Sequence, residues 1–519
     1  MKQLSVIILV ILLSQGCLQK KPAGTMEKYQ PAIHFSPGKV WTSDAIGLVS
    51  DGSDYHLFYQ FLSDSSDSGK LEWGHARSKD LIDWQHEVKI ILPDSLAEVL
   101  LSTTVVDARN TSGLGKDGKA PWVALALLHK DDNDFAGVID FNNLALVFSL
   151  DNGQTWSKHN SKSDSTISDL QECKYPRLIW HEESRKWIMV GSRNDRVSFY
   201  SSTDLINWAF ESDFGAGKGS HTGTWEYVDL FRLRVNGEDE TKWILGVSVD
   251  QGTLNGGSGI QYFPGNFDGH EFEFIGEKPK WVDYGKDNYA GITCQDLANG
   301  RTLFVGWMNN WQYANLIPAT GWRGILTFPR ELSLVKKHIE YLLNAQPARE
   351  LQPIEQDKNM LEETEIEGLV EFHHDFETPL ELNLNFNTSN MTQFGFAEKF
   401  GIELSNATGE KLIIGYNNLE KYFFIDRTNA GNYIESPDFK WVNYAPYMEN
   451  ESSMDWQLII DASSVELFAK NGLIVMTERI FPTEAFNSIK LFSDHGKIKL
   501  TNGYISQLKN NKPNLNNIR

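Results

Sequence analysis

Five runs of aromatic and β-branched residues recur along the first two thirds of the chain, and this repeat limits the folds open to it. The runs are Tyr55–Phe61, Trp122–Leu128, Lys186–Gly191, Lys242–Val247 and Thr302–Trp307. Their starts lie roughly 55 to 70 residues apart, which is long enough for a four-stranded β unit with its loops. Amphipathic helices are scarce, so we expect an all-β chain in which residues 31–345 form a five-bladed β-propeller.

A second pattern recurs in phase with the first. Its copies are Ser78–Trp84, Ser149–Trp156 and Ser202–Trp208. Each contains a small polar residue, an Asp in a turn and then a Trp, which is typical of a hairpin turn closed by an aromatic on the next strand. We expect these Trp side chains to pack between blades.

The composition changes after Tyr341. Residues 346–375 are acidic, with Glu362, Glu363 and Glu365 at their centre, and are expected to form a linker. Short strand patterns then return at intervals of about ten residues, with Asn471-Gly472 as a hairpin turn. We therefore expect a β-sandwich over residues 376–508 and a frayed tail over residues 509–519.

The N-terminus has the form of an export signal. Lys2 precedes an apolar run, Leu4–Leu13, which is followed by Ser14-Gln15-Gly16-Cys17. A small residue before a cysteine resembles a bacterial lipobox, so residues 1–17 are expected to be a lipoprotein-type signal with Cys17 as the lipidation site. Plain secretion and a short buried helix are the alternatives.

Residues 18–30 are expected to be a flexible tether between that lipid and the folded part of the chain. This arrangement predicts an exported lipoprotein in the periplasm or at the cell surface, in contact with the membrane through the lipid anchor only. The apolar run is too short to span about 30 Å of hydrocarbon as a helix. The sequence does not specify the membrane leaflet.

The composition narrows the choice of ligand. With 48 basic and 69 acidic residues the net charge is −21, which argues against a nucleic-acid partner because its phosphates would be repelled. The 16 Trp residues suit neutral ring-shaped ligands such as sugars, although blade packing accounts for most of them. Cys17, Cys173 and Cys294 match no zinc spacing. Neither the His and Cys spacing nor the mechanism expected below calls for a metal or an organic cofactor, so none is predicted. The oligomeric state is left open.

In a propeller the first strand of each blade lines a central channel, so residues just before each repeated run are expected to face it. Asp44 precedes the first run and Glu226 precedes the fourth, in equivalent places. Glycoside cleavage needs such a pair, with one carboxyl protonated to donate to the leaving oxygen and the other ionised. From the residues alone, solvated loop charges remain the alternative.

Several separate blocks give a more specific indication. They are Asn255–Gly259, Gln261–Phe263, Gly306–Asn315, Gly321–Arg323, Phe328–Leu332, Asp461 and Ser464–Glu466. In these blocks the chain resembles glycoside hydrolase family 32, the family of levanases, inulinases and invertases. The resemblance covers nearly the whole chain after the signal, and it implies a five-bladed propeller followed by a β-sandwich.

The resemblance also implies catalytic roles. Asp44, within Trp41–Gly47, stands where the family has its nucleophile, and Glu226, which begins Glu226–Asp229, stands where it has its general acid/base. Asp44 would attack a fructosyl unit while Glu226 protonates the departing oxygen, with overall retention and carboxyl groups about 5 to 5.5 Å apart. The other family contacts that the chain keeps are Trp41, Gln60, Trp73 and Trp311, for which packing is the alternative role.

The chain departs from the family motifs around the same sugar subsite. The Arg-Asp-Pro motif reads Lys174-Tyr175-Pro176, the Cys after the acid is Tyr227, and a Phe-Ser-Gly-Ser segment reads Leu100–Thr103. A Tyr supplies no fixed negative charge, and a Lys lacks the planar fork of Arg. We expect a reshaped pocket whose substrate-binding residues include Ser102, Thr103, Lys174, Tyr175 and Tyr227.

These observations predict a retaining glycosidase that hydrolyses β-fructosidic linkages in fructans, fructo-oligosaccharides or sucrose, with an altered sugar pocket. One alternative is a catalytically weak or inactive relative that holds fructan at the cell surface. Another is transglycosylation, in which an acceptor sugar replaces water. Linkage preference and endo or exo attack are left open, and structural roles are expected for His75 and His221.

Overall fold

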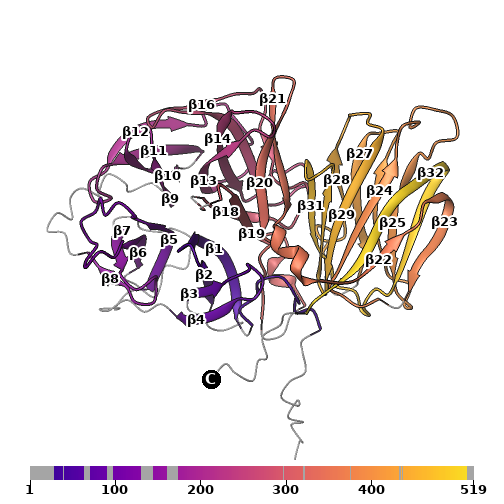
Figure 1. Ribbon diagram of the computed structural model, residues 1–519, viewed down its shortest axis with the longest axis horizontal. Helices are drawn as coiled ribbons and strands as arrows, with labels where there is room; N and C mark the ends of the chain where they lie inside the picture. The colour runs from indigo at the N-terminus through magenta and orange to yellow at the C-terminus, as the bar shows by residue number, and fades with distance from the viewer. Residues whose placement is uncertain are drawn as a thin grey trace, which may run out of the picture.

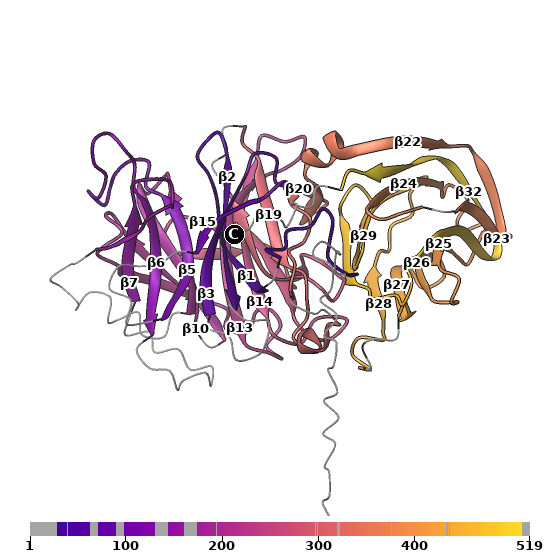
Figure 2. The same ribbon diagram turned by 90° about the horizontal axis from the view of Figure 1, so that it is seen from below.

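The chain folds into two β-domains that lie side by side, a propeller and a sandwich (Figures 1 and 2). A computed structural model describes residues 28–510 except 39, 63–70, 90–97, 130–143, 160–173, 194, 296, 298, 319–321, 375, 432, 433 and 435. The expected signal with Cys17, most of the expected tether and residues 511–519 lie outside this part. Within it the helices are the 3₁₀ turns η3 (Ala314–Leu316) and η4 (Arg349–Ile354), and no helix is long and apolar enough to cross a membrane.

The propeller has five blades, each an antiparallel sheet whose strands follow chain order from the channel outwards (Figure 1). Blade 1 contains β1 (Trp41–Ser50), β2 (Tyr55–Leu62), β3 (Leu71–Ser78) and β4 (Gln85–Lys89). Blade 2 contains β5 (Glu98–Val106), β6 (Trp122–His129), β7 (Leu144–Ser149) and β8 (Ser157–Lys158). Blade 3 contains β9 (Lys174–His181), β10 (Lys186–Arg193), β11 (Arg196–Ser202) and β12 (Ala209–Phe214). Blade 4 contains β13 (Trp225–Arg234), β14 (Thr241–Val249), β15 (Gly259–Phe267) and β16 (Phe272–Phe274), with β17 (Lys280–Trp281) paired to β15. Blade 5 contains β18 (Tyr289–Cys294), β19 (Thr302–Trp307), β20 (Arg330–Lys337) and β21 (Glu340–Pro347).

Both sequence repeats correspond to blade elements, which confirms the predicted propeller. The five aromatic runs are the second strands of the blades, β2, β6, β10, β14 and β19. The Trp at the end of each turn pattern donates its indole N–H to a backbone carbonyl three residues earlier: Trp84 to Leu81 (2.8 Å), Trp156 to Gly153 (2.9 Å) and Trp208 to Leu205 (3.1 Å). One local hydrogen bond therefore fixes the same turn in three blades.

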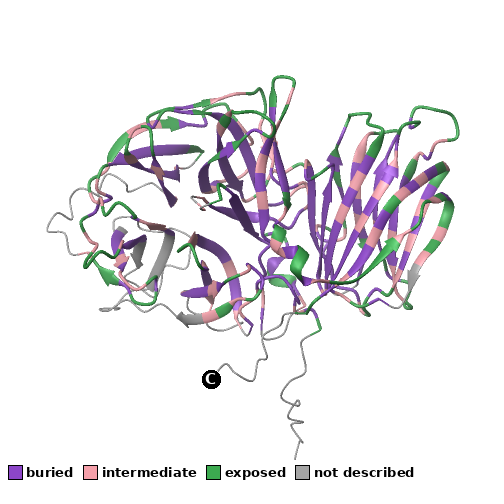
Figure 3. Ribbon diagram, in the orientation of Figure 1, coloured by how far each residue is buried: buried purple, intermediate pink, exposed green. Residues whose placement is uncertain are grey.

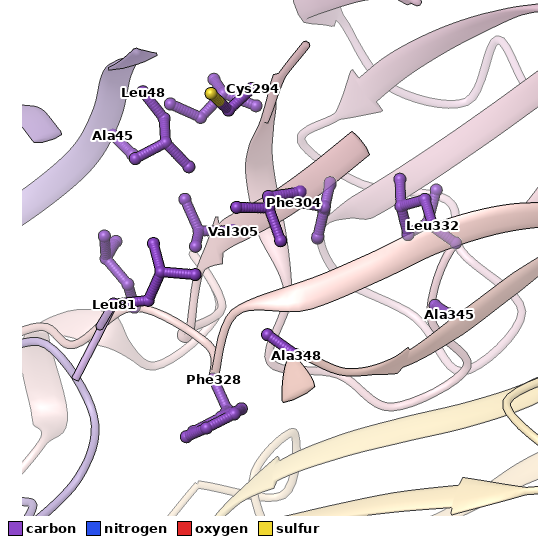
Figure 4. Packing of buried hydrophobic residues seen from close by; sticks show 14 of the residues in the cluster. Ala45, Leu48, Leu81, Cys294, Phe304, Val305, Phe328, Leu332, Ala345 and Ala348 are labelled. Atoms are coloured by element: carbon purple, nitrogen blue, oxygen red, sulfur yellow. The ribbon is translucent and has the colours of Figure 1, made fainter. Parts of the chain in front are cut away.

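The ring closes where the segment after β19 returns to β1. Thr42 donates its backbone N–H to the Arg323 carbonyl at 2.7 Å, and Arg323 donates to the Val40 carbonyl at 3.0 Å. Apolar side chains fill the space behind this closure (Figure 4), among them Ala45 and Leu48 from β1 and Phe304 and Val305 from β19. Packing between the first and last blades holds Asp44 in place, since it lies on the same strand as Ala45 and Leu48.

The C-terminal domain is a sandwich-like sheet folded around its own apolar core, as predicted. Its strands are β22 (Glu355–Leu361), β23 (Thr364–His374), β24 (Leu380–Asn387), β25 (Lys399–Ser405), β26 (Lys411–Asn417), β27 (Tyr422–Asn429), β28 (Val442–Pro446), β29 (Ser453–Asp461), β30 (Ser464–Ala469), β31 (Ile474–Arg479) and β32 (Ser488–Leu508). The first half of the long strand β32 pairs with β23 and β25, and the second half pairs with β22 and β24. Figure 2 shows β32 curving over the domain and joining its two layers.

The acidic segment 346–375 contains structure that the linker expectation did not include. Strands β22 and β23 lie within it and pair with β32. Their acidic side chains face lysines of β32, with Lys497 2.8 Å from Glu365 and 3.2 Å from Glu367. The dense charge belongs to the solvated face of a strand, which is why composition alone suggested a linker.

Buried charges join the two domains. Arg330 of β20 donates to Asp283 at 2.8 Å and to Glu466 of β30 at 2.7 Å, while Arg427 of β27 donates to Asp287 at 2.7 Å. All five side chains are buried, and Figure 3 shows purple ribbon on both sides of the junction. Several of the blocks that carry the family resemblance therefore meet at this junction, outside the channel.

The start of the described chain is also part of the junction. His34 contacts Asp461 and Glu466, each at 2.8 Å, and Tyr29 is 5% exposed with its hydroxyl bonded to the Pro482 carbonyl at 2.8 Å. Residues 28–30 thus pack on the sandwich, unlike the flexible tether expected there. The reason is that Tyr29 buries its ring against Phe481, with ring centroids 5.3 Å apart.

Candidate active site

The inner strand of every blade carries a β-bulge within the segment predicted to face the channel. The ladder is interrupted between Thr42 and Ala45, Leu101 and Thr103, Lys174 and Arg177, Glu226 and Val228, and Tyr289 and Ile292. A bulge bends a strand and re-aims its side chains. The bulge in each of the five inner strands therefore changes the direction of side chains in the segment that was predicted to face the channel.

Three of the bulges contain a non-glycine residue in the left-handed conformation. The φ angles are 47° at Tyr175, 43° at Tyr227 and 49° at Ala290. Such conformations are uncommon for residues with a Cβ and cost free energy, so the surrounding packing must hold them. Strained backbone of this kind clusters at functional sites, and here it lies beside Glu226.

Asp44 lies on β1 and is 2% exposed. Its Oδ2 accepts hydrogen bonds from the Tyr227 hydroxyl at 2.6 Å and from the Ser43 hydroxyl at 2.9 Å. Its Oδ1 is buried and has no hydrogen-bond partner among the described residues. Burial raises the pKa of Asp44 to about 6, with a further contribution from the charge of Glu226, although the two hydroxyl donors oppose the shift.

Glu226 lies on β13 and accepts a hydrogen bond from the Tyr289 hydroxyl at 2.6 Å through Oε2. Burial raises its pKa above the ordinary value, and the charge of Asp250 adds to the shift, while the Tyr289 hydrogen bond and Lys174 oppose it. A carboxyl whose pKa is raised stays protonated to higher pH, as a general acid requires. Each predicted catalytic carboxyl thus has a tyrosine donor from another strand or blade.

Tyrosine rings connect the two carboxyl groups. Tyr175 stacks on Tyr227 with ring centroids 4.0 Å apart and an interplanar angle of 22°, and Tyr227 meets Tyr289 edge to face at 5.7 Å. Burial raises the pKa of Tyr227 and of Tyr289 well above the ordinary value, so both remain hydrogen-bond donors. The contact of the Tyr289 hydroxyl with Glu226 depends on how blades 4 and 5 meet, so no short stretch of sequence reveals it.

Two residues after Tyr175 and Tyr227, an ion pair links the inner strands of the neighbouring blades 3 and 4. Arg177 of β9 donates to Asp229 of β13 at 3.3 Å and to the carbonyl of Thr293 in β18 at 2.9 Å. The other Asp229 oxygen accepts from the backbone N–H and hydroxyl of Thr293, at 2.7 and 2.8 Å. These contacts therefore join the inner strands of blades 3, 4 and 5 three residues along β13 from Glu226.

Two known domain families together match most of the chain. Residues 34–346 match the N-terminal domain of Glycosyl hydrolases family 32, and residues 350–507 match the C-terminal domain of that family. The chain belongs to glycoside hydrolase family 32. It is therefore a glycosidase that hydrolyses O-glycosyl compounds.

Curated relatives and solved structures agree with this assignment to family 32. The chain is 33% identical to a levanase of Bacillus subtilis strain 168, over 93% of this chain and 71% of that protein. It is 31% identical to an extracellular exo-inulinase of Aspergillus niger, over 91% of this chain and 93% of that protein. The crystal structure of exo-inulinase from Aspergillus awamori superposes with a TM-score of 0.82 at 27% identity, over 94% of this chain and 99% of that one. The β-fructofuranosidase from Schwanniomyces occidentalis complexed with fructosyl-erythritol gives a TM-score of 0.80 at 26% identity, over 93% and 98%.

Two of the contacts that the family resemblance predicted, Trp41 and Trp73, are packed side chains in the structure. Trp41 is 8% exposed, and the Arg323 guanidinium lies over its ring at 5.1 Å. Trp73 is 2% exposed and contacts Phe58 and Trp156, with ring centroids 5.6 and 5.0 Å away. The packing role describes Trp73 better than a ligand contact does.

Among the other predicted pocket residues, Gln60 and Lys174 lie close to the carboxyl pair, whereas Thr103 makes a contact between blades. Gln60 is buried opposite the bulge of β1 that contains Asp44. Lys174 lies near enough to Glu226 for its charge to lower that pKa. Thr103 is fully buried, and its hydroxyl accepts from the Leu178 backbone N–H at 3.4 Å, which is a contact between blades. The side chain of Ser102 lies outside the described residues.

Trp311 follows β19, whose last residue pairs with Tyr289 at the start of β18, and it is 46% exposed. The inner strands β13 and β18 begin at this end of the channel, next to Glu226, and we call this end the channel mouth. Its ring centroid is 4.8 Å from that of Trp307 and 6.5 Å from that of Tyr289, the donor to Glu226. An exposed ring in contact with the tyrosine donor of a half-buried acid is suited to contact a sugar, and the ligand role of Trp311 stays a prediction.

The two histidines considered in the sequence have structural surroundings. His75 is buried, contacts the His56 ring nitrogen at 2.9 Å and stacks on Phe58. Burial lowers the pKa of His75 to about 3, so it is neutral near pH 7. His221 stacks on Trp225, with ring centroids 4.9 Å apart. Among the described residues no group of His, Cys, Asp and Glu side chains could hold a metal ion.

Proposed function

We propose that this family 32 glycosidase hydrolyses β-fructosidic linkages in fructans, fructo-oligosaccharides or sucrose, with retention through a fructosyl-enzyme intermediate. The observation that carries the proposal is the pair Asp44 and Glu226, each hydrogen-bonded at 2.6 Å by a tyrosine of the channel. The names of the relatives, levanase, exo-inulinase and β-fructofuranosidase, support the choice of a fructosyl substrate.

In the first step, Asp44 acts as the nucleophile. Its unpartnered oxygen, Oδ1, bonds to the anomeric carbon of the fructosyl unit while Tyr227 and Ser43 hold Oδ2. The bond from that carbon to the leaving oxygen breaks, and the proton of Glu226 passes to the leaving oxygen. The raised pKa of Glu226 keeps this proton available above the ordinary range of a carboxylic acid.

In the second step, Glu226 acts as the base. It takes a proton from water, whose oxygen bonds to the anomeric carbon as the ester bond to Asp44 breaks. Two displacements at one carbon give net retention, and both carboxyl groups return to their starting states. Tyr227 donates to Asp44 when it leaves as a carboxylate, and Tyr289 donates to Glu226 while it is ionised.

The pocket for the fructosyl unit differs in charge from the family motif. The stacked Tyr175 and Tyr227 rings present an apolar wall where the family has a carboxylate. We infer that this wall makes the enzyme rely on ring contacts more than on ionic hydrogen bonds to sugar hydroxyls. An altered preference among fructosides follows from that change.

Turnover assays on levan, inulin, sucrose and non-fructosyl oligosaccharides test the proposal. Asp44→Asn is expected to lower turnover by at least about 1000-fold. Glu226→Gln is expected to do the same with sucrose, but to recover the first step with a fructoside whose leaving group needs no protonation. The exposed Glu238→Gln is the matched control and should leave turnover unchanged. Binding of fructan without product from any substrate would overturn hydrolysis in favour of a binding role.

We also propose that the protein is exported and anchored through a lipid on Cys17. The support is the sequence Ser14-Gln15-Gly16-Cys17 after an apolar run, together with the extracellular relatives. Cys17→Ser is expected to move the protein from the membrane fraction to the soluble fraction, whereas the buried Cys294→Ser control should stay in the membrane fraction. Unchanged fractionation of Cys17→Ser would contradict the anchor.

A further inference from the structure

Large apolar side chains are exposed where the sandwich meets the mouth of the channel. Leu254, Trp311, Trp441 and Tyr444 are 54%, 46%, 49% and 38% exposed. We call these four residues the seam surface. Leu254 lies in the loop between β14 and β15, Trp311 follows β19, and the other two belong to the sandwich beside or within β28.

A propeller loop connects Trp311 to Tyr444. The Trp311 backbone N–H donates to the Ser258 hydroxyl at 3.3 Å. Three residues earlier, the Asn255 side chain donates to the Tyr444 carbonyl at 2.9 Å and accepts from the Tyr444 N–H at 3.0 Å. The Asn255 amide thus pairs with the free edge of β28 as another strand would, and it fixes Tyr444 next to the channel mouth.

A second link holds the loop before Trp441. Gln312, next to Trp311, donates to Asp438 at 3.2 Å, and Asp438 lies three residues before Trp441. The Lys286 ammonium donates to the Asp438 carbonyl at 2.8 Å. Two separate sets of hydrogen bonds therefore join the exposed side chains of the sandwich to the mouth of the propeller.

The apolar surface continues along the outside of the sandwich. Tyr444 lies on the outward-facing side of β28, since its neighbours Asn443 and Ala445 are buried. Its ring contacts Tyr422 of β27 at 4.9 Å, and Tyr422 contacts Phe424 at 6.3 Å. Both contacts are edge to face, with interplanar angles of 80° and 77°, so the rings form one continuous aromatic patch rather than isolated exposed side chains.

The position of Trp311 indicates which part of a substrate this surface would meet. Its ring contacts Tyr289, whose hydroxyl donates to Glu226, the proposed acid. Glu226 protonates the leaving oxygen, so the seam surface begins on the leaving-group side of the bond that breaks. A polymer whose terminal unit occupies the pocket would extend in this direction.

Flat aromatic faces bind the apolar faces of sugar rings, and a neutral polysaccharide is not repelled by a chain of charge −21. We propose that the seam surface binds the fructan chain beyond the scissile linkage. This inference rests on the proposed function for its choice of polymer. It assigns to the sandwich a direct role in holding polymeric substrate.

Trp441→Ala, Tyr444→Ala and the double variant test this role. Tyr444 meets Asn255 through its backbone, so its substitution leaves those hydrogen bonds in place. We expect kcat/KM on levan or inulin to fall about tenfold in the double variant, mainly through KM, as for removal of an aromatic anchor. Activity on sucrose should stay unchanged because sucrose ends near the pocket. The matched control is Phe394→Ala, which removes a fully exposed aromatic side chain elsewhere on the sandwich and should leave kcat/KM on the polymers unchanged.

Affinity electrophoresis in gels containing levan or inulin separates this inference from the proposed function. On an Asp44→Asn background, polymer retardation should weaken when Trp441 and Tyr444 are replaced, whether or not the parent enzyme turns over. Equal losses on sucrose and polymer, or unchanged polymer binding and KM, would overturn the role of the seam surface. Absence of turnover on every fructoside, with retardation still dependent on Trp441 and Tyr444, would overturn only the hydrolytic function. If the double variant fails to fold, the single variant Trp441→Ala provides the same comparison.

Discussion

Tyr227 donates its hydroxyl hydrogen to Oδ2 of Asp44 at 2.6 Å, although 183 residues separate the two in sequence. Tyr227 stands in a bulge next to Glu226 and has a φ of 43°. A single residue beside the proposed acid therefore holds the proposed nucleophile. The ionisation of Asp44 depends on this contact, because a hydrogen bond to the ionised form lowers the pKa of a carboxyl.

Tyr227→Phe should move the pH profile of turnover. Burial raises the pKa of Asp44, and the hydrogen bond from Tyr227 lowers it. Without that hydrogen bond the pKa should rise further above about 6. Asp44 must be ionised to attack, so the acidic limb of kcat/KM should shift to higher pH by about one unit. Tyr341→Phe, which removes a hydroxyl bonded to Glu240 at 2.9 Å on the outer edge of blade 5, should not shift it. An unmoved acidic limb in Tyr227→Phe would refute this coupling.

Asp229→Asn should destabilise the channel without shifting the pH profile. The substitution leaves the buried Arg177 guanidinium without its partner charge, and breaking a buried pair typically costs about 3 to 5 kcal/mol of unfolding free energy. Denaturant unfolding measures this loss. Replacing Arg177 and Asp229 together by Leu should restore part of it, because no unpaired charge remains. A double variant less stable than both single variants would contradict the account.

Gly324→Ala should disturb β1 near Asp44. A Cβ at Gly324 would lie 1.8 Å from the Thr42 carbonyl oxygen, and φ there is 76°. We expect a loss of more than about 3 kcal/mol in unfolding free energy together with lower kcat, since Thr42 lies two residues before Asp44. Gly118→Ala is the control, because Gly118 has a φ of 78° but open space around it, so its cost should stay near 1 kcal/mol. Equal effects of the two substitutions would show that contact with Thr42 does not matter.

Alkaline pH should weaken the domain junction. Burial alone would lower the pKa of His34, but hydrogen bonds to Asp461 and Glu466 outweigh it and raise this pKa to about 9. A pKa raised above the unfolded value of about 6.5 contributes stability below pH 6.5 that is lost as the pH rises toward 9. Burial also raises the pKa of Glu478 to about 8. Because the folded state holds this proton more tightly than the unfolded chain, Glu478 too contributes stability that is lost as the pH rises toward 8.

Unfolding free energy measured between pH 6 and 9 should therefore fall with rising pH. His34→Gln should be less stable by about 3 to 5 kcal/mol at pH 6 and should show a weaker fall over this window. The exposed His495→Gln is the control, since His495 is 78% exposed. A slope that His34→Gln leaves unchanged would assign the pH dependence to other groups.

The repeats and turns were predictable because they depend on local chemistry. Aromatic and β-branched runs mark the second strand of each blade, and Asn471-Gly472 forms the expected hairpin turn, with φ of 54° and 85°. Because Asp44 and Glu226 each come just before one of these runs, the repeat also predicted that they lie on inner strands. Strands β22 and β23 were not predicted, because their acidic side chains resemble a linker until Lys497 and its neighbours pair with them.

The sequence by itself determined the all-β architecture, the family and the two carboxyl groups, since strand periodicity, turn residues and family motifs are readable over short stretches. Only the tertiary structure decided that Tyr227 and Tyr289 hold these carboxyl groups, that Trp73 packs between blades, and that Asn255 connects the channel mouth to Tyr444. The physical reason is distance along the chain. These contacts join residues tens to hundreds of positions apart and form only when blades meet, the ring closes, and the sandwich docks on it.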